Sequence, residues 1–305
     1  MHRAYAGAPP SPLRARFETW LMRRPNLAGY GLLSPTVLLM ILAFVTPVVV
    51  LFLLSFWTSY PFQPDATKTL AHYSAFFDNP IYRRLLIKSI RISAIVTAVT
   101  VILAYPAAYF IAFRVHRNKL VWLILITIPF WTSYLLRVFA WKVVLGYNGL
   151  VNSSLIGIGA IEQPLTFLLY NEWAVTITLA HAWAAFAILP IYVSLEKIDR
   201  SLLEAAYDLG EGPAMTFLRV TLPLSAPGVI SAALLVFIPT VGEYVTPKLV
   251  GGTTGIMIGN IIQSMFGREA NWPMGAAISF MSLLAITLIV CAFLWGTRWT
   301  RKAVA

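Results

Sequence analysis

The chain has 305 residues, of which 59% are hydrophobic and only 11% charged, and its formal net charge is +11. So few charged residues exclude an ordinary soluble domain, which needs a water-facing surface, and indicate a protein whose main solvent is membrane lipid. A basic excess is also typical of nucleic-acid-binding proteins. Here the basic residues flank apolar runs, as membrane topology requires, so no nucleic-acid partner is expected.

Six charge-free runs approach or exceed the roughly 20 residues that a helix needs to cross a bilayer core of about 30 Å. They are residues 25–64, 92–113, 120–136, 173–195, 220–242 and 270–297. Because backbone amides in lipid must be paired within their own segment, runs of this length predict helices rather than strands. The predicted fold class is an all-α membrane protein with about six transmembrane helices.

In chain order, the pattern predicts a basic N-terminal tail at 1–30, a transmembrane domain at 31–297 and a short C-terminal tail at 298–305. The helices are expected within 31–57, 88–113, from 120 onwards, and within 173–195, 225–242 and 272–295. Two further uncharged runs, 143–161 and 249–267, are rich in Gly, Asn and Ser and are interpreted as folded or re-entrant loops rather than crossings.

The basic residues indicate how the chain is oriented. With the N-terminus inside and six crossings, 14 of the 23 Lys and Arg fall on the cytoplasmic side, which favours cytoplasmic placement of both termini, although Arg83, Arg84 and Lys88 run against it. Cys291 is the single cysteine and lies in the last apolar run, so the sequence predicts neither an intrachain disulfide nor a cysteine-based metal site. No metal and no cofactor are expected.

The loop at 196–225, between the fourth and fifth predicted helices, is the most informative segment. It holds five of the 12 acidic residues and is interpreted as two short helices joined by a turn. Ser201 and Glu204 have the spacing of a capping box at the start of the first helix. Gly210 and Gly212 break that helix, and Pro213 suits the first position of the next. Such an amphipathic hairpin could dock into a partner's groove or lie on the protein's own surface.

The same loop carries a longer pattern. After Glu204-Ala205-Ala206 there are three intervening residues and then Gly210, and after nine further residues comes Val220-Thr221-Leu222-Pro223. This spacing resembles the EAA signature of permease subunits of binding-protein-dependent ABC importers, with Val220 at the position of the usual isoleucine. The resemblance implies a type I importer permease fold in a bacterial cytoplasmic (inner) membrane, and it extends from about the first to the last predicted helix.

The resemblance also implies partners: an ABC ATPase dimer, a second permease subunit that forms a heterodimer with this one, and an extracytoplasmic solute-binding protein. It assigns ATPase coupling to a set of residues in the loop, namely Glu204, Ala205, Ala206, Asp208, Gly210, Leu222 and Pro223. No G-x-x-x-x-G-K-[ST] phosphate loop occurs in the chain, so it is not expected to be an enzyme or to contain catalytic residues, and a partner would hydrolyse ATP. Glu204 alternatively only caps its helix.

At finer grain, segments 129–137, 148–152 and 239–247 resemble the spermidine/putrescine (polyamine) branch of these permeases. Glu243, at the outer end of the fifth helix, is the candidate substrate contact because a carboxylate near lipid is costly without a use. Tyr244 and Trp131 are candidate ring faces for a cationic amine. Alternatively, Glu243 lies in the wet interface or pairs with Lys248 or Arg137.

Two other functions stay open at this point. Related permeases for another small organic solute or for ferric iron share parts of these segments. An ion-coupled secondary transporter is the alternative from a different class, and such proteins place ionisable residues in mid-membrane and show inverted repeats. The predicted helices here are nearly free of charge and no internal repeat is evident, which favours the ATP-driven importer.

Overall fold

The structure is a computed structural model that describes residues 25–58 and 67–304; most of the predicted N-terminal tail, residues 1–24, lies outside this part. The chain divides into two compact units, with the boundary after Leu54. In the first unit, α2 (Pro25–Leu54) contains no charged residue and two internal prolines, Pro35 and Pro47. From residue 29 to 50 all of its side chains are exposed, as a helix surrounded by lipid requires.

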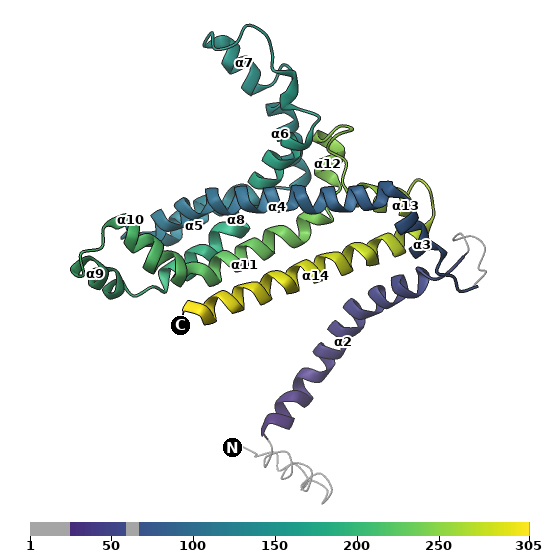
Figure 1. The fold of residues 1–305 in the computed structure, drawn as a ribbon, viewed down its shortest axis with the longest axis horizontal. Coiled ribbons are helices and arrows are strands. Elements are labelled where there is room, and N and C mark those ends of the chain that lie inside the picture. Colours follow the sequence, from purple (N-terminus) through teal and green to yellow (C-terminus); the bar gives the residue numbers. More distant parts are fainter. Residues whose placement is uncertain (1–24, 59–66, 305) are drawn as a thin grey trace, which may run out of the picture. The chain divides into compact units, whose positions relative to one another are not determined.

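The second unit, Ser55 onwards, contains the remaining helices of the described chain (Figure 1). They are α3 (Ala71–Asp78), α4 (Pro80–Tyr109), α5 (Lys119–Thr127), α6 (Tyr134–Val144), α7 (Leu150–Gly157), α8 (Glu172–Glu196), α9 (Arg200–Asp208), α10 (Pro213–Thr216), α11 (Leu222–Val241), α12 (Val245–Val250), α13 (Ile258–Phe266) and α14 (Trp272–Val304). Two π-helical segments, η1 (Phe110–Arg114) and η4 (Phe217–Thr221), extend α4 and precede α11. The 3-10 turns are η2 (Ile128–Trp131) and η3 (Thr166–Leu168).

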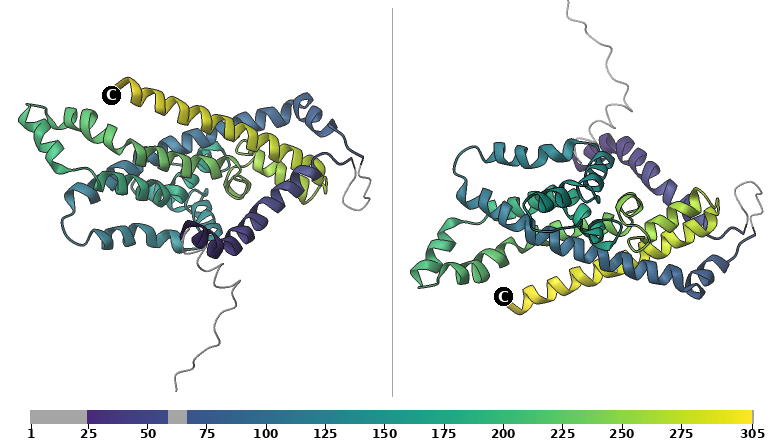
Figure 2. Two further views of the ribbon diagram at one scale, coloured as in Figure 1. Left: turned by 90° about the horizontal axis from the view of Figure 1, so that it is seen from below. Right: turned by 90° about the horizontal axis from the view of Figure 1, so that it is seen from above.

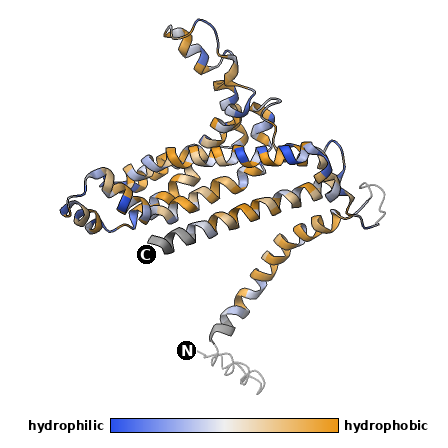
Figure 3. Ribbon diagram, in the orientation of Figure 1, coloured by the Kyte–Doolittle hydropathy of each residue, from blue (hydrophilic) through white to orange (hydrophobic). Residues whose placement is uncertain are grey.

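Five helices of the described chain are long and apolar enough to cross a membrane, and a sixth crossing results if the bent pair α5–α6 counts as one. The predicted class, an all-α membrane protein with about six transmembrane helices, is therefore confirmed. Figure 3 shows that the long helices are hydrophobic along their lengths and that hydrophilic residues gather at helix ends and in the loops. The helix α14 continues to Val304, so the predicted C-terminal tail at 298–305 is largely a continuation of this helix.

The third predicted helix differs from expectation because it is broken. The arm Lys119–Trp131, which contains α5 and η2, meets Tyr134–Val144 at 85°, and α5 alone is too short to cross. Pro129 in η2 has no backbone donor, which weakens the helix there. The Arg137 guanidinium donates to the carbonyl oxygens of Pro129 (3.3 Å) and Thr132 (3.2 Å) at the break, and to Ala182 of α8 (3.3 Å). Arg137 thus joins the Thr132 hydroxyl in supplying hydrogen-bond donors to backbone carbonyls at the break.

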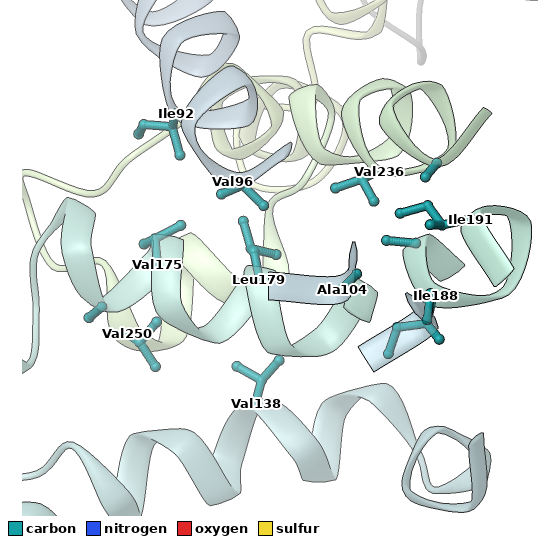
Figure 4. Close-up of a cluster of buried hydrophobic side chains, with 14 of the residues drawn as sticks. Ile92, Val96, Ala104, Val138, Val175, Leu179, Ile188, Ile191, Val236 and Val250 are labelled. Atoms are coloured by element: carbon teal, nitrogen blue, oxygen red, sulfur yellow. The ribbon is translucent and has the colours of Figure 1, made fainter. Parts of the chain in front are cut away.

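The core of the second unit lies where α4, α8 and α11 pack together. Five alanines of α8 are buried, and such small side chains allow close approach between helices in a membrane. They are Ala174, Ala180, Ala182, Ala185 and Ala187. Figure 4 shows Leu179 of α8 packed among branched side chains of the neighbouring helices, including Val96 of α4 and Val236 of α11. Since these residues are fully buried, this three-helix core is the rigid scaffold on which the loops are placed.

Within the second unit, the short helices lie in two groups, one at each end of the long helices (Figure 2). The short helices α9 and α10 lie together at one end of the long helices, and the C-terminal end of α14 points toward the same end. At the other end, α3 and α13 pack against α14. The 196–225 loop therefore projects from the opposite end of the core to the segment that contains α12 and α13.

Candidate functional site

The 196–225 segment folds as the predicted helical hairpin, which we call the 196–225 hairpin. The first arm, α9, ends at Asp208 with Leu209 as its C-cap, and Gly210 then takes a left-handed backbone conformation with φ +83°. Only glycine adopts that conformation without strain, which explains its position at the end of the helix. Pro213 is the first residue of α10, as predicted, and α9 packs against both α10 and η4.

The expected capping box at Ser201 and Glu204 is wrong. The N-cap is Asp199, two residues earlier, and its carboxylate accepts a hydrogen bond of 3.0 Å from the backbone N–H of Ser201. Ser201 therefore lies inside the first turn, and Glu204 is exposed on the helix surface rather than folded back onto the cap. The bond from Ser201 also holds the pKa of the Asp199 carboxyl below its usual value, since hydrogen bonding stabilises the charged form.

The residues of the hairpin separate into a buried side and an exposed side. Ala206 is 7% exposed and faces inward. Exposed positions include most of the residues that the signature singles out, namely Glu204, Ala205, Asp208, Gly210, Leu222 and Pro223. Beside them three large apolar side chains, Leu202, Tyr207 and Leu209, are open to the surroundings, and Leu209 is 85% exposed. We call Leu202, Glu204, Tyr207, Asp208 and Leu209 the hairpin tip.

The charges of the hairpin indicate that it lies in water rather than in lipid. Exposed apolar side chains are unfavourable in water, so the hairpin tip is expected to be covered by a partner. Two ion pairs hold the hairpin without covering the tip, one at its base and one between η4 and the turn that joins the two arms. Lys119 at the start of α5 lies 2.8 Å from Glu196 at the end of α8, and Arg219 lies 2.5 Å from Glu211. The pairing of Lys119 with Glu196 had no signal in the sequence, because these residues belong to different spans.

Asp199 gives a testable prediction about the hairpin. Replacing Asp199 by Ala removes the cap, so hydrogen exchange in 200–208 should accelerate, whereas Asp199→Asn, which keeps an acceptor, should leave it near wild type. A lowered pKa in the folded state means that the stabilisation is present above the usual Asp pKa and is lost as pH falls through the lowered value. The difference in helix stabilisation between Asp199→Ala and wild type, measured as protection from hydrogen exchange, should therefore be constant from about pH 5 to 8. Equal exchange in both proteins would contradict the cap.

At the opposite end of the core, Glu243 has a defined structural role. Its Oε1 accepts hydrogen bonds of 3.1, 2.8 and 3.3 Å from the backbone N–H groups of the next three residues, at the start of α12. In the described part of the chain no ion pair joins it to Lys248 or Arg137, so the pairing considered from the sequence is wrong. Only one of the two carboxylate oxygens is used in these bonds, and the side chain is half-buried.

The surroundings of Glu243 include one of the two predicted aromatic residues. Tyr244 follows directly in the chain and is partly exposed, and its carbonyl oxygen accepts a bond of 2.8 Å from Asn260 at the start of α13. Trp131 is 82% exposed at the α5–α6 break, and no ring contact or hydrogen bond between described residues brings it to Glu243. The hydroxyl of Tyr134, which the sequence did not single out, lies 2.6 Å from that of Thr246 on α12.

His181 in α8 is held by packing and one hydrogen bond. The indole N–H of Trp141 donates to its Nδ1 at 3.0 Å, and the Phe130 ring stacks on it at 5.9 Å between centroids. Among the described residues no group of three His, Cys, Asp or Glu could hold a metal ion.

Comparison with known proteins identifies the family. Residues 32–302 match the model of the binding-protein-dependent transport system inner membrane component. The chain is 35% identical over 236 residues to the spermidine/putrescine transport system permease protein PotB of Escherichia coli K12, which covers 77% of this chain and 85% of PotB. It is 30% identical over 295 residues to the inner membrane ABC transporter permease protein YdcU of the same organism, covering 92% and 93%.

A solved structure shows the same fold. It is that of a bacterial ABC transporter involved in the import of the acidic polysaccharide alginate, with a TM-score of 0.66 over 94% of this chain and 99% of that one, at 17% identity. The importer-permease architecture expected from the signature is therefore confirmed. The chain belongs to the family of binding-protein-dependent transport system inner membrane components and is a multi-pass permease subunit of an ABC importer.

Proposed function

We propose that this permease forms half of the pathway of a polyamine importer, with putrescine or spermidine as solute. The observation that carries the proposal is the 35% identity to PotB across most of both chains. The chain would pair with a second, related permease, take solute from an extracytoplasmic binding protein and depend on a separate ABC ATPase dimer for hydrolysis. A solved alginate transporter in complex with a solute-bound periplasmic protein supports this general assembly.

The 196–225 hairpin is the surface proposed to contact the ATPase. Its tip offers an exposed Leu209 and Tyr207 beside the carboxylates of Glu204 and Asp208, a combination suited to an apolar groove with a basic rim. ATP-driven closure of the ATPase would draw the two hairpins together and change the access of the pathway. Because the hairpin would face the ATPase in the cytoplasm and the C-terminal end of α14 points toward the same end of the core, the C-terminus would be cytoplasmic. The N-terminus would be cytoplasmic too if the chain crosses the membrane an even number of times, and extracytoplasmic if the number is odd.

Reconstitution tests this function. The chain, its second permease and its ATPase are placed in proteoliposomes with the binding protein, and uptake of labelled spermidine and putrescine is measured with and without ATP. ATP-dependent uptake that requires the binding protein is expected. Uptake by the permease alone, without any associated nucleotidase, would favour an ion-coupled transporter. ATP-dependent uptake of ferric iron or another organic solute, with none of polyamine, would refute the substrate and keep the importer.

Glu243 allows the polyamine contact to be separated from the fold. Because its Oε1 caps α12 through backbone N–H groups, Glu243→Gln retains an acceptor while losing the charge, whereas Glu243→Ala loses both. If the second oxygen binds an ammonium group, Gln should raise the apparent KM for spermidine about 10- to 100-fold, which corresponds to one charge-assisted hydrogen bond of about 1.5–3 kcal/mol. Uptake kinetics measure this, and the protein should remain folded.

An unchanged KM in Glu243→Gln would remove Glu243 from the substrate pathway. Loss of folded protein in Glu243→Ala, together with normal transport in Glu243→Gln, would assign it to capping alone. Tyr244→Ala and Trp131→Ala in the same assay test whether the proposed ring faces bind the amine, since each would lose a cation–π contact.

A further inference from the structure

The inner ends of α4 and α11 are joined by a cluster of aromatic rings that neither the signature nor the relatives assign. The central residue is Phe217, the first residue of η4, directly after α10 of the hairpin. Its ring meets the Tyr105 ring edge-on, with 5.6 Å between centroids and 90° between planes, and the Tyr109 ring at 6.2 Å and 74°. A hairpin residue is thus held between two rings of a transmembrane helix, α4.

Tyr105 is attached at two points to the chain that follows the hairpin. Besides its ring contact with Phe217, its hydroxyl lies 2.8 Å from that of Ser225, which is fully buried in the first turns of α11. The Leu222-Pro223 pair of the signature lies between these two attachment points. Tyr105 therefore spans the junction at which the hairpin becomes a transmembrane helix.

The part of α4 that receives this contact is a weak point in the helix. Pro106 follows Tyr105 and removes one backbone donor, and the π-helical segment η1 begins directly after Tyr109. Kinks and changes of direction in helices concentrate at prolines and π-bulges. Tyr109 also packs on Phe113 of η1, with 4.8 Å between centroids, so the cluster reaches across this joint.

A second contact ties the same joint to the base of the hairpin. The Lys119 ammonium donates to the carbonyl oxygen of Ala112 in η1 at 2.9 Å and to both carboxylate oxygens of Glu196 at 2.8 Å. Glu196 ends α8, where the hairpin begins. Both ends of the hairpin are therefore connected to the π-helical joint of α4, through Phe217 on one side and Lys119 on the other.

We propose that Phe217 is a positioning residue that transmits movement of the 196–225 hairpin to the π-helical joint at the inner end of α4. Its ring contacts those of Tyr105 and Tyr109, so a displacement of α10 would move both rings and with them the weakened turn at Pro106. This inference rests on the proposed function, because it assumes that an ATPase moves the hairpin. It adds the path by which that movement enters the membrane.

The test uses the assembled complex and a readout that needs no solute. In a Cys291→Ser background, an environment-sensitive label is attached at Ile102→Cys, an exposed position on α4, and ATP with vanadate is added. The label signal should change in the parent complex and in Phe217→Tyr, which keeps a ring. In Phe217→Ala the change should be lost, and ATPase stimulation by loaded binding protein should fall about tenfold, while the ATPase still co-purifies.

A matched control removes a ring contact of similar geometry in which no hairpin residue takes part. Trp122 on α5 meets Phe110, the first residue of η1, edge-on at 5.9 Å and 80°, so Trp122→Ala removes a ring from the joint but not from the hairpin and should leave the label signal intact. A normal signal in Phe217→Ala, or an equal loss in Trp122→Ala, would overturn the inference. Failure of the ATPase to co-purify with the parent permease would instead overturn the proposed coupling to an ATPase, and this inference with it.

Discussion

Gly228→Leu is expected to abolish accumulation of folded permease. Gly228 lies on α11 where it crosses α8, and a Cβ atom added there would lie 2.5 Å from the carbonyl oxygen of Pro190 and 2.5 Å from the Cβ of Ser194. Neither neighbour can rotate away, because one belongs to the backbone and the other is fixed to it. One extra methylene in a packed core costs about 1–3 kcal/mol, and leucine adds several at the principal helix crossing.

The measurement is the monodisperse fraction of a fluorescent fusion on size-exclusion chromatography after detergent extraction, followed by thermal unfolding. Gly228→Ala should already lower the Tm, and Gly228→Leu should leave little monodisperse protein. Gly296→Leu is the matched control, since Gly296 is an exposed helical glycine of α14 with nothing within 4 Å of an added Cβ. Normal behaviour of Gly228→Leu would mean that α8 and α11 do not cross closely at this position.

This crossing illustrates what the sequence could and could not predict. The long spans followed from length and hydrophobicity alone, because lipid leaves the backbone few choices. The contact between Gly228 and Pro190 could not be predicted, since many glycines and prolines fall in the spans and only the packing distinguishes them. In the same way the break after α5 had a local signal in Pro129, but its angle depends on Arg137 reaching α8, which is a tertiary contact.

The candidate site shows a similar division. The hairpin could be predicted because glycines, Pro213 and the acidic residues act locally. Its cap was assigned to Ser201 rather than Asp199, because both residues are good N-caps and the choice depends on where the chain leaves α8. The capping role of Glu243 depends on three backbone amides that converge only after α11 has ended, so its charge and position indicate only a substrate contact, a place in the wet interface or an ion pair. The ring cluster around Phe217 joins residues from two spans and had no sequence signal.

Substitution of Gly210 is the second change with a large expected effect. We expect Gly210→Trp to abolish transport and ATPase coupling while membrane insertion remains normal. Gly210 is exposed, adopts φ +83° and has nothing within 4 Å of an added Cβ, so a large side chain would not disturb the fold of this chain by a clash. It would instead strain the turn by about 1–2 kcal/mol and place bulk beside Leu209, on the surface proposed to meet the ATPase.

Three variants separate these two causes. Asn tolerates the left-handed conformation, so Gly210→Asn should retain most coupling, and Gly210→Ala, which is strained but small, should lie between Asn and Trp. Gly212→Ala is the control, because Gly212 has φ −74° and open space around it. Solute-stimulated ATP hydrolysis and the membrane-inserted fraction are measured for each. Normal stimulated hydrolysis in Gly210→Trp would refute the assignment of this hairpin to coupling, because a tip that tolerates a tryptophan beside Leu209 cannot be enclosed by a partner.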